Sequence, residues 1–331
     1  MNRSRIAAFS LAMALTIWLI PGHQAGTAQT EPIKVAATFS ILADLVQNVG
    51  GDLVQVETIV KANMDAHTFE PSPQEVIAVT DASIIFEIGL DFEPWLDGIV
   101  EASQAPAARV VVSDGIALRA ASDHGDEVHD DEAHDDEAHD DEAHDDSDHG
   151  HEHGEFDPHV WHDVMNAGIM VQNIADALAE ADPQNADQYQ QQAAAYQADL
   201  DELDAWIFEA VSAVPEDHRK MVTSHDTFGY YADRYGFEIL GTPLGISTET
   251  SDPAAGEIAA LIEAIQDSGV PAIFTENVSS SAVIDQIAND ASVIVAPPLF
   301  TDALGEPESE GATYVEMMRY NTETIVEALV A

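Results

Sequence analysis

The side chains best suited to metal chemistry in this sequence are its histidines, and eight of them lie in one segment. They alternate with aspartates and glutamates between Ser122 and Asp157, where no Lys or Arg balances the charge. The eight are His124, His129, His134, His139, His144, His149, His151 and His153. Neutral imidazole is the commonest side-chain metal ligand, and His-rich tracts are typical of metal binding. The tract is therefore predicted to supply auxiliary, weak metal sites.

An ordered site is not predicted within this tract. Histidines five residues apart would be rotated by about 140° per step on a helix, so they would not share one face. Asp, Gly and Ser are also poor helix formers. We expect a disordered loop over about residues 120–156, with many weak and exchanging cation positions. A solvating acidic linker without metal chemistry is the alternative.

Four further residues lie outside the tract, each after a predicted strand or in a loop between elements. They are His67 in DAHTFEPSP, His159 in DPHVWHD, His225 in SHD and Asp302 in TDALG. Ligand sites in α/β sheets gather at strand ends, so these residues are candidates for one ordered site. Singly, each also fits a surface histidine, a capping segment or a turn aspartate. His162 competes with His159, since residues three apart can share a helix face.

Hydrophobic periodicity predicts the elements that position these residues. Strands are predicted over 33–39, 54–60, 83–88, 109–112, 221–223, 237–241, 272–275 and 293–296. Helices are predicted over 40–50, 72–80, 94–103, 164–180, 185–214, 226–235, 253–268, 280–291 and 313–329. This alternation predicts an α/β fold with parallel sheets in two lobes, 31–163 and 215–331. A helical connection, 164–214, joins them without a loose linker.

Composition limits the possible functions. The 331 residues are 46% hydrophobic, which is enough for two domains with cores, and they carry a formal net charge of −52. This acidity argues against nucleic acid and anionic membranes as partners and favours cations. Cysteine is absent, so we expect no disulfide, no thiolate site and no lipid-modified cysteine. An ordered metal site must use imidazole and carboxylate, which suit zinc and other first-row divalent ions.

The first 28 residues are predicted to be a secretory signal. Arg3 and Arg5 precede an apolar run over 6–20, and the small residues at 26 and 28 suit cleavage after Ala28. The run is short for a membrane span, and an uncleaved anchor is the alternative. We therefore expect an exported, periplasmic protein, working as a monomer.

Together, the segments DAHTFEPSP, DPHVWHD, SHDTFGYYADRYG and TDALG resemble the zinc- and manganese-binding solute receptors of ABC importers. The resemblance covers the chain from about Ile33 to the C-terminus and includes an acidic His-rich insertion before the second ligand. It implies that His67 and His159 bind the metal from the N-terminal lobe, and His225 and Asp302 from the C-terminal lobe. The metal would lie in the cleft between lobes that a rigid backbone helix spans; either central helix suits this role. His162 is not at a ligand position of the family.

The third ligand discriminates between metals in this family, because manganese receptors commonly carry Glu there and zinc receptors carry His. This chain has His225. Three imidazoles and one carboxylate suit four-coordinate zinc, whereas manganese prefers more oxygen donors. The resemblance thus implies a receptor that captures Zn²⁺ and delivers it to the membrane permease of an ABC importer. A manganese or iron receptor, or a periplasmic zinc chaperone or store without a permease, are the alternatives.

No enzymatic activity is expected. Three histidines with a bound water form a catalytic zinc pattern, so a zinc hydrolase is the rival from another class. Asp302 would fill the fourth position, however, and the sequence contains neither an H-E-x-x-H motif nor a phosphate-binding P-loop. If its imidazoles are unperturbed, the site should lose zinc affinity below about pH 6.

Overall fold

A computed structural model describes residues 31–121, 155–246 and 253–330. The predicted signal at 1–28 and the eight histidines of the tract lie outside these ranges. The chain from Pro32 onward forms one compact unit with two α/β lobes. No helix in the described ranges is both long and apolar enough to cross a bilayer.

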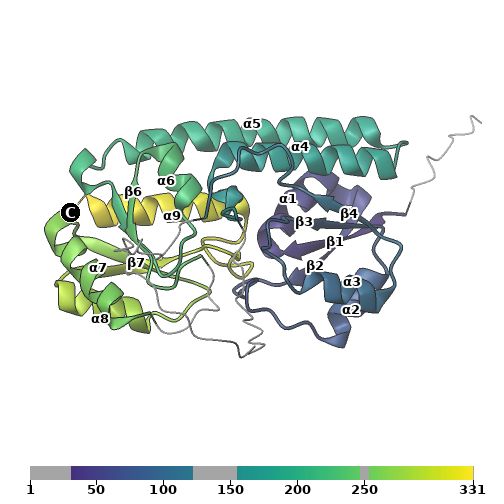
Figure 1. Ribbon diagram of the computed structural model, residues 1–331. Helices are drawn as coiled ribbons and strands as arrows, with labels where there is room; N and C mark the ends of the chain where they lie inside the picture. The colour runs from purple at the N-terminus through teal and green to yellow at the C-terminus, as the bar shows by residue number, and fades with distance from the viewer. Residues whose placement is uncertain (1–30, 122–154, 247–252, 331) are drawn as a thin grey trace, which may run out of the picture. The chain divides into compact units, whose positions relative to one another are not determined.

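Within the described residues, the N-terminal lobe contains a four-stranded parallel sheet and three helices (Figure 1). Its strands are β1 (Ile33–Phe39), β2 (Val54–Val60), β3 (Ile84–Glu87) and β4 (Ala108–Val111), in the order β2-β1-β3-β4. Its helices are α1 (Ser40–Gly50), α2 (Pro73–Thr80) and α3 (Leu96–Ser103). Val35 pairs with Val56 on one side and with Ile84 on the other, so β1 and β3 are the central strands. The ends of these strands present loops toward the C-terminal lobe.

The C-terminal lobe contains two parallel strand pairs within the described ranges. The pairs are β5 (Lys220–Val222) with β6 (Glu238–Gly241), and β7 (Ala272–Glu276) with β8 (Ile294–Leu299). Its helices are α6 (Gly229–Tyr235), α7 (Ala255–Ser268), α8 (Ala282–Ala291) and α9 (Tyr314–Leu329). Short 3₁₀ turns elsewhere span Gly51–Leu53, Val160–His162 and Glu216–His218.

Two antiparallel helices connect the lobes, α4 (Val164–Ala181) and α5 (Ala186–Val211). They run side by side along one face in Figure 1. Helix α5 packs against α1 of the N-terminal lobe and against α6 and α9 of the C-terminal lobe. The structure therefore identifies α5 as the helix that spans both lobes, a choice that the sequence left open.

Every predicted strand and helix is present; some bounds coincide with the prediction, and the others shift by at most three residues. One three-residue shift is in the helix predicted from 226, which begins at Gly229. Here the amide of Asp226 donates to the carbonyl of Gly245, and that of Thr227 donates to the carbonyl of His225. Because these amides bond outside a helix, His225 stays in a loop. The N-terminus of α2 follows the sequence closely, since Ser72 and Glu75 form a reciprocal capping box.

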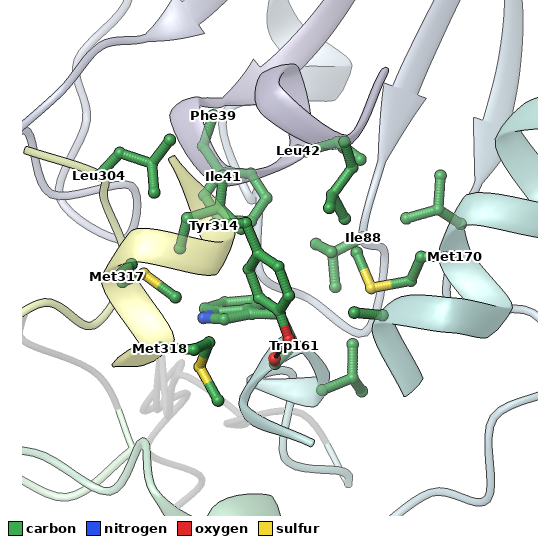
Figure 2. Packing of buried hydrophobic residues seen from close by; sticks show 14 of the residues in the cluster. Phe39, Ile41, Leu42, Ile88, Trp161, Met170, Leu304, Tyr314, Met317 and Met318 are labelled. Atoms are coloured by element: carbon green, nitrogen blue, oxygen red, sulfur yellow. Dashed lines mark hydrogen bonds between the residues drawn. The ribbon is translucent and has the colours of Figure 1, made fainter. Parts of the chain in front are cut away.

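The hydrophobic core continues across both lobes. Trp161 and Tyr314 lie at its centre (Figure 2), among side chains of α1, α4 and α9. The hydroxyl of Tyr314 donates to the carbonyl of Trp161 at 2.7 Å, and the indole of Trp161 donates to the carbonyl of Thr301 at 3.0 Å. A smaller cluster, which includes Ile265 and Ile287, packs beneath α7 and α8. Shared packing therefore fixes the segment that carries His159.

A partly buried carboxylate also joins the lobes. Oδ2 of Asp44 on α1 accepts the backbone N–H of Tyr314 at the start of α9, at 3.0 Å. Burial raises the pKa of Asp44 to about 6, and nearby Glu316 adds to this effect. The folded protein therefore favours the protonated acid. This stabilisation is present below pH 4 and is lost as the pH rises through about 6.

We predict that Asp44→Asn stabilises the metal-free protein above pH 7. Asparagine keeps an acceptor oxygen and removes the charge that burial disfavours. The gain should be about 1–2 kcal/mol, because one pKa unit corresponds to about 1.4 kcal/mol. Urea unfolding at pH 5 and pH 8, with chelator present, measures it. A difference from the parent protein that is the same at both pH values would contradict this explanation.

Candidate metal centre

Four buried side chains from separate loops meet between the lobes. His67 follows β2, His159 precedes the turn at Val160–His162, His225 follows β5 and Asp302 follows β8. The side chain of His67 is 7% exposed, and the other three are fully buried. One ligand atom from each lies within 4.8 Å of all the others, and the group could hold a metal ion. The structure thus brings together the four residues that the sequence singled out.

The spacing of these atoms suits a small cation. Oδ2 of Asp302 lies 3.0 Å from Nε2 of His225 and 3.4 Å from Nε2 of His67. Oδ1 of Asp302 lies 3.6 Å from Nε2 of His159, and the Nε2 atoms of His67 and His159 are 3.2 Å apart. A tetrahedral ion with bonds of about 2.0–2.1 Å requires ligand atoms about 3.3–3.4 Å apart. The observed distances bracket that value.

Two side chains fix the backbone of the loop that carries His67. Oδ1 of Asp65 accepts the amide of His67 at 2.8 Å, which makes a tight local turn. The indole of Trp95 donates to the carbonyl of Ala66 at 2.8 Å and anchors the turn to the N-terminal lobe. The imidazole therefore points inward with little freedom.

The aromatic ring of Phe92 packs behind two of the imidazoles, a contact that was not predicted from the sequence. The ring of Phe92 lies edge-on, 4.9 Å from that of His67 and 6.1 Å from that of His159. The preceding Leu90 and Asp91 both have positive φ, a conformation that L-residues adopt at a cost. Buried Glu93 holds this turn by accepting the amides of residues 88 and 89. Burial raises the pKa of Glu93 to about 7.

Two buried carboxylates orient the imidazoles of His159 and His225. Neither carboxylate was predicted from the sequence. Asp157 Oδ1 lies 2.8 Å from Nδ1 of His159 and accepts its amide at 3.0 Å. Glu276 pairs with Nδ1 of His225 and accepts its amide at 3.0 Å. A proton shared at Nδ1 leaves Nε2 as a lone-pair donor, which is the usual role of such carboxylates beside metal sites. The available signals were the DPH segment for Asp157 and an acid that ends the apolar run AIFTE for Glu276.

The charged side chains of the group shift the pKa values of His225 and Asp302. Burial disfavours the imidazolium of His225, but the adjacent Glu276 and Asp302 outweigh this and raise its pKa well above the usual value. Burial likewise disfavours the carboxylate of Asp302, but His225 and His159 outweigh this and hold its pKa well below its usual range. In the metal-free protein a proton on His225 therefore offsets the buried charge of Asp302.

His162, the competitor of His159, does not join the group. Its ring lies 4.5 Å from that of Phe228, and neither ring nitrogen has a hydrogen-bond partner in the part of the chain that the structure describes. Burial, with a further contribution from His159, lowers the pKa of His162 to about 3. His162 is therefore a neutral, packed imidazole beside the group.

Comparisons with known proteins show which sequences and structures this chain resembles. The chain matches the sequence model of the family described as zinc-uptake complex component A, periplasmic, over residues 35–328. It is 32% identical to the manganese-binding lipoprotein MntA of Halalkalibacterium halodurans over 300 residues, 90% of this chain and 89% of that one. It is 30% identical to the manganese ABC transporter substrate-binding lipoprotein PsaA of Streptococcus pneumoniae, and the match covers 91% of this chain and 90% of that one.

A solved structure gives the same picture of the fold. The periplasmic zinc-binding protein TroA of Treponema pallidum matches with a TM-score of 0.75 and 27% identity. The match covers 90% of this chain and 99% of that one. The predicted two-lobe α/β fold is thereby confirmed.

We predict that Glu276→Gln weakens metal binding by about 10–100-fold, the usual effect of removing an outer carboxylate. Glutamine accepts the amide of His225 but does not favour the Nδ1 proton by charge. Competition with a chromophoric chelator measures the affinity. Glu87→Gln is the control, because Glu87 is also buried but pairs with Arg109. Equal affinities of both variants and the parent would refute the role of Glu276.

We also predict that metal binding releases a proton at pH 7. The raised pKa of His225 keeps its imidazole protonated, and only the neutral form binds a metal. Affinity should therefore already fall as the pH drops through 7, above the value expected for unperturbed histidines. Calorimetry in buffers of different ionisation enthalpy counts the proton, on protein lacking residues 123–153. A buffer-independent enthalpy at pH 7 would contradict this.

Proposed function

We propose a function on the premise that this chain belongs to the family of the periplasmic zinc-uptake complex component A. Members of this family are metal-binding substrate-binding receptors of ABC transporters, not enzymes. The question that follows is which metal the chain carries and how it holds and releases that metal.

We infer that the cargo is Zn²⁺, bound by His67, His159, His225 and Asp302. The observation that carries this proposal is the donor set: three imidazole nitrogens and one carboxylate oxygen, with spacings near a tetrahedral edge. Zinc accepts such a set in four-coordinate geometry, whereas manganese favours more oxygen ligands. Manganese is the second candidate, since both curated relatives described above are named as manganese proteins.

The geometry suggests how capture and release work. The incoming ion displaces the proton of His225 and takes over the compensation of the Asp302 charge. Within the described residues all four side chains are buried, which hinders exchange of the ion in this conformation. Two ligands come from each lobe, so a separation of the lobes divides the site into two weak pairs. The chain would thus hold the ion in transit and release it at a membrane permease.

The cellular setting follows from the same proposal. The chain works outside the cytoplasm, in the periplasm, as a monomer whose partners are a zinc ion and an ABC permease, with no nucleic acid. The His-rich tract would gather zinc near the receptor or sense its supply. A zinc chaperone without a permease would need the same buried site. A permease gene beside the gene for this chain would favour the receptor over the chaperone.

We predict one tight zinc site in protein that lacks residues 123–153. Calorimetric titration with Zn²⁺ and with Mn²⁺ should show tighter binding of Zn²⁺, because of the nitrogen-rich donor set. His67→Ala should abolish the tight site. His218→Ala is the control, since His218 bonds the carbonyl of Leu329 and lies outside the group. Tighter binding of Mn²⁺ would reverse the metal assignment, and the absence of any tight site would refute the receptor site.

A further inference from the structure

The two chain segments that flank the His-rich tract are joined beside the metal centre. Ala120 pairs with Phe156 in an antiparallel bridge. The amide of Asp157 donates to the carbonyl of Arg119 at 2.9 Å. This pairing sets the side chain of Arg119 next to the carboxylate that orients His159.

Arg119 links that carboxylate to helix α6 of the other lobe. Its Nη1 lies 3.4 Å from Oδ2 of Asp157, and its Nε donates to Oδ2 of Asp233 on α6 at 3.2 Å. Tyr230, also on α6, accepts the amide of Arg119 at 2.9 Å and donates to the carbonyl of Asp157 at 3.1 Å. Two residues of α6 thus hold the pair of Arg119 and Asp157.

Asp157 is fully buried and uses its two oxygens for different partners. Oδ1 receives the amide of His159 and contacts its Nδ1, while Oδ2 faces Arg119. Gly229, the first residue of α6, makes room for this contact. A Cβ at that position would lie 2.5 Å from Nη1 of Arg119 and 2.8 Å from Oδ2 of Asp157.

We propose that Arg119 is a positioning residue that sets the metal affinity of His159 through Asp157 and couples it to the docking of α6. This inference rests on the proposed function. His159 reaches the site from the N-terminal lobe, yet its orienting carboxylate is held by a helix of the C-terminal lobe. That helix follows the loop of His225. Movement of α6 away from Arg119 therefore loosens Asp157, and His159 loses its fixed orientation as the lobes separate.

The test measures zinc dissociation, by stopped flow into excess chelator, from protein without residues 123–153. Arg119→Gln should raise the dissociation rate about tenfold, the lower range for an outer-shell partner. Arg119→Lys should raise the dissociation rate less than Arg119→Gln, because lysine keeps the positive charge. It should not restore the parent rate, because one ammonium cannot contact both carboxylates as the guanidinium does. Tyr230→Phe should also accelerate release. Arg109→Gln is the matched control, since Arg109 also joins two carboxylates, Glu87 and Asp97, but contacts no ligand.

Two further readouts separate positioning from general stability. The visible spectrum of bound Co²⁺ should change in Arg119→Gln and not in Arg109→Gln. Asp157→Asn should weaken binding, and adding Arg119→Gln to it should weaken binding no further, because Arg119 acts through Asp157. A lowered melting temperature with unchanged dissociation rate and cobalt spectrum would overturn the positioning role alone. If the parent protein has no tight site sensitive to His67→Ala, both the role and the proposed function fail.

Discussion

The arrangement of the centre depends on one buried carboxylate, that of Asp302, held among three imidazoles. An ionised carboxylate without solvent is costly unless opposite charge or hydrogen bonds compensate it. In the metal-free chain the compensation comes from His225, whose Nε2 is 3.0 Å away and whose pKa is raised. A cation satisfies the same requirement more completely. A proton on His225 thus offsets the charge of Asp302 in the metal-free group.

The imidazoles differ in what lies behind them. His225 contacts Glu276 at Nδ1 and Asp302 at Nε2, so its imidazole lies between two carboxylates. His159 is backed by Asp157, whose charge is shared with Arg119. The first arrangement strongly favours positive charge at the imidazole. The second makes the orienting carboxylate depend on the contact with α6. One imidazole is therefore set by local electrostatics and the other by the docking of the lobes.

Packing supplies the frame in which these charges can be placed. Trp161 lies two residues after His159 and is bonded to Thr301 and Tyr314 of the C-terminal lobe. Thr301 in turn precedes Asp302. Helix α5 contacts both lobes, and its buried side chains belong to the same core as theirs. The four loops of the metal centre therefore approach one another from fixed directions. The positions of His159 and Asp302 are therefore a consequence of core packing rather than of their own loops alone.

The sequence by itself determined the order of strands and helices, because periodicity of apolar residues records which side faces a core. It also marked the four residues that meet, since each lies after a strand or in a loop between elements, in a segment of distinctive composition. Only the tertiary structure decided that α5 spans the lobes, that Glu276 and Asp157 orient two imidazoles, and that His162 packs against Phe228 instead of joining the group. These relations connect residues far apart in the chain or depend on ring direction. Periodicity carries no information on either, because both are set by packing between elements.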